Sequence, residues 1–133
     1  MLVMKLVWKD SKQKKRDNNQ SLFKLNNMIH YVNQKPFIEG VSLEDIAKVN
    51  PTPFYVYSQS KITNTYKQLE STLNSEIFYA VKANSNQAII KLMAKLGAGA
   101  DVVSIGELER AILAGLHPQK IIFEGIGKSQ KDI

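Results

Sequence analysis

Lys82 is the residue of this sequence whose type and position first suggest covalent chemistry. It directly follows the apolar run 77–81, which is typical of a strand buried on both faces. In parallel α/β proteins, ligands and catalytic groups gather at the carboxyl ends of the strands. Low-dielectric walls there would favour the neutral amine of Lys82, which could attack an aldehyde carbon and form a Schiff base. From this position alone, a lysine that reaches from the strand end into water is the simpler interpretation.

The segment 125–129 suggests a different chemistry, the binding of nucleotide phosphates. It contains the triplet Gly127, Lys128 and Ser129, which also occurs in phosphate-binding loops. Such a loop requires a further glycine at the position that Ile122 holds, inside an expected strand. We therefore interpret Lys128 as a surface residue of an ordinary loop.

Metal and thiol chemistry have little support in the composition. The sequence has no cysteine, and its only histidines, His30 and His117, lack the spacing of metal ligands. We therefore expect no metal. The absence of cysteine is compatible with a reducing cytoplasm, and no stretch is long and apolar enough for a membrane span, so we expect a cytoplasmic protein.

The net charge of +6 belongs mainly to the first part of the chain. Residues 1–28 contain seven basic and two acidic residues, whereas the other 105 residues contain 11 basic and 10 acidic ones. No aromatic residues interleave the basic run 12–16, as they would in many nucleic-acid-binding arms. We therefore expect 1–28 to be a poorly ordered basic leader, and we expect neither nucleic acid nor membrane as a partner.

The elements that must position Lys82 follow a βα repeat. Two extended segments, 28–32 and 36–39, precede a short helix that Ser42 caps. Strands and helices then alternate at intervals of about twenty residues, as in a parallel sheet with crossover helices. The strands are expected at 54–57, 77–81, 101–104 and 120–123, and the helices at 58–73, 86–96 and 106–114. A doubly wound sheet and a (β/α)8 barrel both remain possible on this pattern.

The segment 79–84, with the sequence YAVKAN, resembles the cofactor-lysine motif of a known family. This family is the barrel-fold pyridoxal-phosphate-dependent decarboxylases, which includes diaminopimelate, ornithine and arginine decarboxylases and, more distantly, alanine racemase. Segments 99–108 and 122–129 resemble the family's next two motifs in order and spacing. The lead-in, 39–43 and 52–57, is most similar to the members that act on diaminopimelate. The resemblance covers residues 29–133.

The resemblance implies a fold and a site. The fold would be a partial (β/α)8 barrel of three to four βα units, within an N-terminal portion of a cofactor-binding domain at 29–133. Lys82 would hold pyridoxal 5'-phosphate, and Asp101 could pair with its ammonium once substrate has displaced it. Glu107 could contribute to the site or simply cap a helix. Ile105 departs from the family pattern, which has a glycine or a polar residue there, and leaves the geometry around Glu107 open.

The function implied is the decarboxylation of meso-2,6-diaminopimelate to L-lysine and CO2, by an enzyme that is a homodimer when intact. The alternatives are another family member, such as an ornithine or arginine decarboxylase, a non-catalytic pyridoxal-phosphate-binding protein, or an interaction module of the basic leader.

The sequence also suggests that this polypeptide is a fragment. It ends just after Ser129 begins a helix, and a barrel of this type needs on the order of 250 residues. Further groups that the family uses for cofactor and substrate are missing. We therefore expect no decarboxylase activity from the chain alone, and poor folding, since a partial barrel exposes an edge strand and apolar helix faces.

Overall fold

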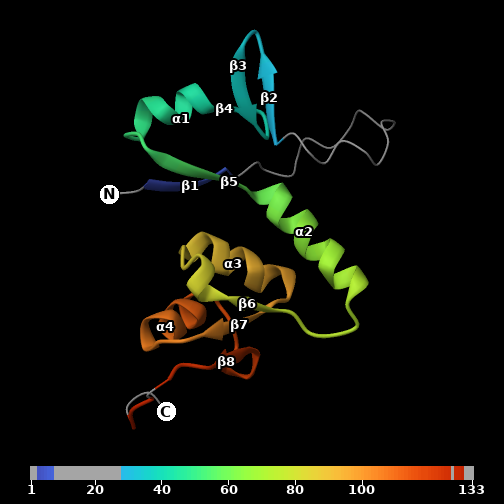
Figure 1. The fold of residues 1–133 in the computed structure, drawn as a ribbon, viewed down its shortest axis with the longest axis vertical. Coiled ribbons are helices and arrows are strands. Elements are labelled where there is room, and N and C mark those ends of the chain that lie inside the picture. The colour runs from blue at the N-terminus through green and yellow to red at the C-terminus, as the bar shows by residue number, and fades with distance from the viewer. Residues whose placement is uncertain (1–2, 8–27, 127, 131–133) are drawn as a thin grey trace. The chain divides into compact units, whose positions relative to one another are not determined.

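The computed structural model describes residues 3–7, 28–126 and 128–130, which belong to two compact units, 1–62 and 63–133 (Figure 1). Helix α2 (Gln59–Thr72) begins in the first unit and continues into the second. The first unit contains strands β1 (Val3–Val7), β2 (Ile29–Val32), β3 (Lys35–Ile38), β4 (Val41–Ser42) and β5 (Phe54–Ser58), and helix α1 (Leu43–Val49). The second contains strands β6 (Phe78–Ala80), β7 (Gly99–Val102) and β8 (Ile121–Phe123), helices α3 (Gln87–Leu96) and α4 (Ile105–Leu113), and the 3₁₀ turns η1 (Val81–Ala83) and η2 (Pro118–Lys120).

Strands β2 and β3 form a hairpin, as the two extended segments predicted. Its turn residues, Asn33 and Gln34, have φ values of 49° and 63°. Positive φ at both positions gives a two-residue turn the twist that paired strands need. The turn sets an antiparallel register in which Val32 lies opposite Lys35, and β4 pairs with the other edge of β3.

Helix α1 begins where the sequence predicted, because Ser42 caps it. The Ser42 hydroxyl accepts a hydrogen bond from the backbone N–H of Asp45 at 3.3 Å, which satisfies one of the free donors of the first turn. The helix packs on β3, and both Ile46 and Ile38 are buried. Burial of these two side chains supplies the small core of this part of the unit.

Strand β5 does not occupy the position that we predicted for it. The βα pattern placed 54–57 in the same sheet as the later strands, but β5 pairs in parallel with β1, with Phe54 opposite Val3. The sheet of β5 has two strands, β1 and β5. Strand β1 also falls within the expected leader 1–28, of which residues 8–27 lie outside the described residues. Parallel pairing joins segments that are distant in sequence, so local patterns do not reveal it.

The second unit contains the parallel sheet that the βα repeat predicted, with three strands in the order β6-β7-β8. Tyr79 lies opposite Ala100, and Ala100 lies opposite Ile121. Helix α3 connects β6 to β7, and α4 leads from β7 toward β8. The described residues therefore form a mixed α/β fold with successive parallel βα units, the arrangement that also builds barrels.

The two faces of this sheet differ because side chains alternate along each strand. One face packs against α3 and α4 and forms the main core. Its buried residues are Val81, Ile90, Ala100, Val102, Ala111, Ala114 and Leu116, with Tyr79, Ala94, Leu108, Ile121 and Phe123 packed against them. Ala80, Asp101 and Ile122 form a neighbouring row in register, and alternation directs this row to the opposite face. Ile122 is 41% exposed, so the described residues cover this face only in part.

Strand β7 begins at Gly99, earlier than the predicted start at Asp101. A Cβ atom at Gly99 would lie 2.3 Å from Cδ1 of Phe78 and 2.7 Å from the carbonyl oxygen of Lys120. Glycine therefore permits β6 and the end of η2 to approach β7 closely. The predicted boundary was wrong because a strand-breaking residue by propensity is required here for packing.

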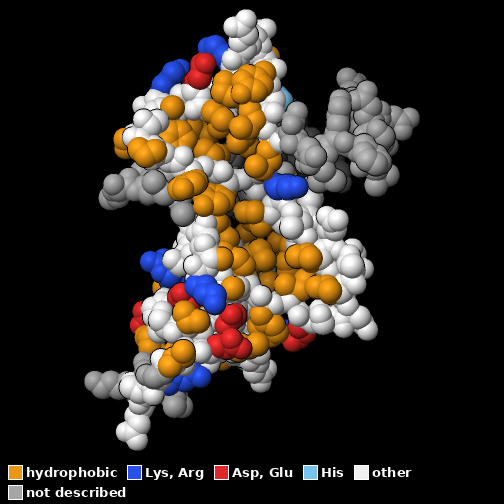
Figure 2. All heavy atoms as spheres, in the orientation of Figure 1, with side chains coloured by type: hydrophobic (Ala, Val, Ile, Leu, Met, Phe, Trp, Pro, Cys, Tyr) orange, Lys and Arg blue, Asp and Glu red, His pale blue; other side chains and the backbone are white. Residues whose placement is uncertain are grey.

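Charged side chains of both signs lie side by side on the visible face of the molecule (Figure 2), in keeping with the small net charge of residues 29–133. Among the described residues, no helix is long and apolar enough to cross a membrane. The same residues contain no group of histidines and carboxylates that could hold a metal ion.

Candidate active site

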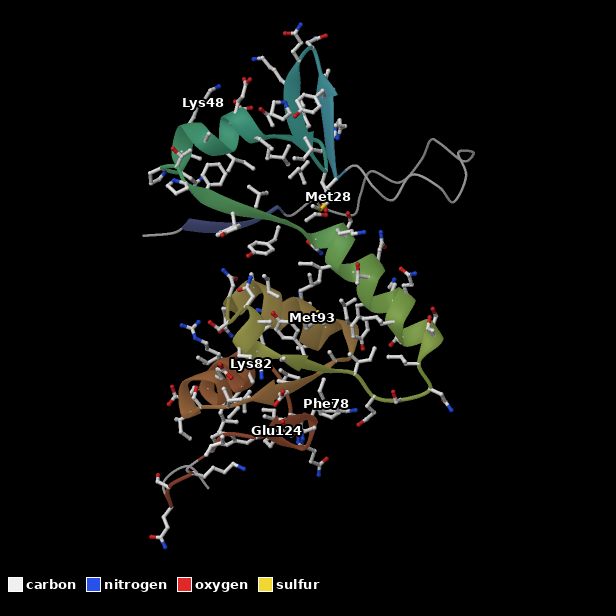
Figure 3. The ribbon with its side chains drawn as sticks, in the orientation of Figure 1. Met28, Lys48, Phe78, Lys82, Met93 and Glu124 are labelled. Carbon is white, nitrogen blue, oxygen red and sulfur yellow. The ribbon has the colours of Figure 1, made fainter. Side chains whose placement is uncertain are left out.

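Lys82 lies in η1, the 3₁₀ turn that directly follows β6 (Figure 3). The preceding residue, Val81, is fully buried in the core, so the backbone of the turn is anchored beside the sheet. The backbone N–H of Asn84 donates to the carbonyl of Val81 at 3.1 Å and closes the turn around Lys82. The structure thus places the lysine at the carboxyl end of a parallel strand, the position that we predicted from sequence.

The surroundings of Lys82 differ from the prediction. Its side chain is exposed, and Ala83 beside it is exposed as well. The low-dielectric walls that we expected are therefore not built by the described residues. The strand before Lys82 is buried mainly on the helix side, because the opposite face of this three-stranded sheet has only partial cover.

Asp101 lies on β7 in register with Ala80, which is two positions before Lys82. The residue is partly exposed, but its Oδ1 atom is buried and has no hydrogen-bond partner among the described residues. Nearly all buried polar atoms in proteins have a partner, so this oxygen marks a place for a donor. Asp101 lies on β7, and the turn with Lys82 follows β6, the strand that pairs with β7. The described residues show no hydrogen bond between the side chains of Asp101 and Lys82.

Glu107 acts as a helix cap in this structure. Its Oε2 atom accepts a hydrogen bond from the backbone N–H of Val103 at 2.9 Å, while its own N–H donates to the Ser104 hydroxyl at 3.3 Å. These reciprocal bonds resemble a capping box at the start of α4. Of the two roles considered from sequence, the described contacts support the capping role.

We expect Glu107→Ala to destabilise α4 by about 1 kcal/mol, because it removes one side of this cap. Amide hydrogen exchange in α4 of the 133-residue chain would measure the change. Glu109→Ala is the matched control, since Glu109 is an exposed carboxylate of the same helix. Equal protection in the two variants would contradict the capping role.

Ile105 has an ordinary helical position as the first residue of α4. Among described residues other than glycine, positive φ occurs at Asn33, Gln34 and Glu39, so Ile105 is not strained by its branched side chain. It lines a shallow hollow of about 220 Å³ beside the ends of β7 and β8, together with Phe123 and Lys128. Isoleucine at position 105, where the family has a glycine or a polar residue, therefore leaves the Glu107 cap intact.

The structure also bears on the segment that resembled a phosphate-binding loop. Ile122 lies within β8, at the position where that loop would need glycine. The ammonium of Lys128 lies 5.3 Å from the ring centroid of Phe123, in a cation–π contact. These contacts fit the interpretation of Lys128 as a surface residue.

The sequence analysis did not predict a role near Lys82 for two residues. Tyr79 and Arg110 donate hydrogen bonds to backbone carbonyls of the loop that follows the lysine. Tyr79 stands inside an apolar strand, where a buried hydroxyl needs a partner, and this was the available signal. Arg110 carried no such signal, because it lies more than twenty positions from its partner, Ser85.

A comparison with known families defines the class of this protein. Residues 59–133 match the pyridoxal binding domain of the pyridoxal-dependent decarboxylases. The match covers more than half of the chain, which therefore belongs to this family. The cofactor of this family is pyridoxal phosphate, as the resemblance of the YAVKAN segment implied.

Individual relatives narrow the likeness. The chain is 43% identical to diaminopimelate decarboxylase of Aquifex aeolicus over 109 residues, which are 81% of this chain and 26% of that protein. The crystal structure of diaminopimelate decarboxylase from M. jannaschii matches with a TM-score of 0.68 and 39% identity, over 80% of this chain and 27% of that one. The Helicobacter pylori enzyme, solved in complex with L-lysine, matches with a TM-score of 0.62 and 41% identity, over 67% of this chain and 23% of that one. The chain thus spans about a quarter of the curated relatives that it matches.

The described residues fit a pyridoxal group. Lys82 offers an exposed primary amine for an aldehyde, on a backbone that Val81 anchors in the core. Asp101 offers a buried carboxylate oxygen that lacks a hydrogen-bond donor. A polar group or an ammonium on this side of the sheet would satisfy that oxygen.

Proposed function

We propose that Lys82 holds pyridoxal phosphate in a decarboxylase that converts meso-2,6-diaminopimelate to L-lysine and CO2. The observation that carries the proposal is the position of Lys82, exposed on a turn at the carboxyl end of β6 within the pyridoxal-binding region. The names of the similar proteins, and the L-lysine in the Helicobacter pylori complex, support the choice of substrate.

Each of the two site residues has a distinct task in this proposal. Pyridoxal phosphate, when bound, accepts the electrons left behind as CO2 departs. Lys82 would hold the cofactor through Nζ, and its side chain would be free of the cofactor once a substrate amine had replaced it. Its Nζ is then free to gain a proton, and the Asp101 carboxylate, with its unpaired Oδ1, would stabilise the resulting ammonium.

The partial barrel and the assembly belong to the same proposal. Three parallel strands with their helices would form part of a (β/α)8 barrel, and further strands would cover the face that carries Asp101 and Ile122. We propose that the whole enzyme is a cytoplasmic homodimer, a state that rests on the family resemblance. Light scattering of the chimera described next would measure its molar mass, and a monomer would contradict this state.

A chimera tests the proposed reaction. This chain would replace the matching N-terminal quarter of the Aquifex aeolicus enzyme, to which it is 43% identical. We expect the chimera to release CO2 and L-lysine from meso-2,6-diaminopimelate and to act much more slowly on ornithine or arginine. A chimera that folds and prefers ornithine or arginine would contradict the proposed substrate. The 133-residue chain, assayed beside it, is expected to show no decarboxylation, because its described residues leave Lys82 exposed to water.

A further inference from the structure

The backbone around Lys82 is held on both sides of the lysine. On the strand side, Val81 is fully buried in the core. On the other side, the N–H of Asn84 bonds to the Val81 carbonyl at 3.1 Å, and the Asn84 side chain accepts the N–H of Asn86 at 3.0 Å. These local bonds define the lysine turn, residues 81–86. The side chain of Lys82 remains exposed while its backbone is constrained.

Tyr79 adds a bond that crosses the position of the lysine. Its ring packs against the core on the helix side of β6, and its hydroxyl donates to the carbonyl of Asn84 at 2.9 Å. The bond therefore ties the strand before Lys82 to the loop after it. Because the ring itself is held by packing, the hydroxyl is a fixed donor rather than a mobile one.

Arg110 of α4 holds the next carbonyl of the same loop. Its Nη1 atom donates to the carbonyl of Ser85 at 3.3 Å. The side chain of Gln87, at the start of α3, donates in turn to the carbonyl of Arg110 at 2.9 Å. Two consecutive carbonyls of the lysine turn are thus bound by side chains from outside it. The Tyr79 bond is the shorter of the two and is partly buried, whereas the Arg110 bond is exposed.

We propose that Tyr79 is a positioning residue for Lys82, and that its hydroxyl orders the lysine turn before the cofactor arrives. This inference rests on the proposed function, in which Lys82 takes the cofactor. A turn that is ordered in advance loses less conformational entropy on attachment, so Nζ meets the aldehyde more often in a reactive geometry. The Nζ amine then bonds to the aldehyde carbon with loss of one water.

The test compares Tyr79→Phe with Tyr66→Phe in the chimera, prepared without cofactor. Both variants lose one hydroxyl from a tyrosine that packs in the second unit, but Tyr66 lies on α2 and contacts no residue of the lysine turn through a described hydrogen bond. Two readouts are taken. The first is amide hydrogen exchange at Asn84 without cofactor. The second is the rate at which added pyridoxal phosphate becomes fixed on Lys82, with borohydride reducing the new C=N bond to a secondary amine and mass spectrometry locating it.

We expect Tyr79→Phe to speed exchange at Asn84 and to slow fixation on Lys82, each by roughly three- to tenfold, the effect of one lost hydrogen bond. The pH midpoint of fixation should not move, because the hydroxyl holds the backbone and not Nζ. Tyr66→Phe should change both rates less than about twofold. Unchanged rates in Tyr79→Phe, equal effects of the two variants, or a shifted pH midpoint would each overturn the positioning role.

The two proposals fail in different ways. If pyridoxal phosphate is never fixed on Lys82 of the unaltered chimera, the proposed function fails. If it is fixed equally fast in the unaltered chimera and in its Tyr79→Phe variant, the positioning role alone fails.

Arg110→Lys, which keeps a donor, and Arg110→Ala, which removes it, provide a second pair of variants. Faster exchange near Ser85 in the alanine variant only would support the ordering of the turn from α4, and faster exchange in neither would count against it.

Discussion

Lys82→Ala is expected to abolish the fixation of pyridoxal phosphate at this position and to lower decarboxylation by the chimera on the order of a thousandfold or more. Among the described residues of the turn after β6, Lys82 alone carries a primary amine that can bond to an aldehyde; alanine removes it, while Val81 keeps the backbone of the turn in place. Mass spectrometry after borohydride reduction measures the first effect, and CO2 release measures the second.

Two further variants make this prediction specific. Lys82→Arg keeps a positive charge but supplies no neutral amine, because guanidinium does not lose its proton in proteins. It should therefore fail as Lys82→Ala fails. Lys91→Ala removes an exposed lysine of α3 and should leave fixation unchanged. Fixation of the cofactor on another lysine of the Lys82→Ala variant, at the original rate, would refute the assignment.

The second large effect is expected from Ile90→Ala, which should destabilise the second unit by about 2–5 kcal/mol. Ile90 is fully buried between α3 and the sheet, in the same cluster as Val81, so the truncated side chain would leave a cavity beside the lysine turn. The free energy of opening, obtained from amide hydrogen exchange across α3, measures the loss.

Ile112→Ala is the matched control for Ile90→Ala. It deletes the same atoms from a side chain of α4 that is 50% exposed. Its effect should stay within about 0.5 kcal/mol, as is usual for surface positions. Similar losses in the two variants would show that Ile90 is not part of a close-packed core.

Several features of this chain could be predicted from local sequence because local physics decides them. Ser42 and Asn86 are good N-caps, and both cap the helices that follow them. Gly97 ends α3 with a φ of 99°, a conformation that costs glycine little. The apolar run before Lys82 predicted a strand buried on both faces; β6 lies there, but it is only half-buried in the described residues, and Lys82 lies in the turn that follows it.

Other features depend on contacts between segments that are distant in sequence. Strand β5 pairs in parallel with β1, and no local pattern in the sequence predicted this partner. Gly99 is a strand residue because Phe78 and the Lys120 carbonyl approach it closely. Glu107 caps α4 because the Val103 amide lies within hydrogen-bond distance of its carboxylate.

The sequence by itself determined that Lys82 follows a parallel strand, since periodicity and apolar composition are local properties. It also carried the family motif around that lysine. Only the tertiary structure decided that Lys82 is exposed, that an Asp101 oxygen is buried without a partner, and that Tyr79 and Arg110 bind the carbonyls after the lysine. The physical reason is that exposure and hydrogen bonding depend on which distant side chains reach a site, and packing sets this only once the chain has folded.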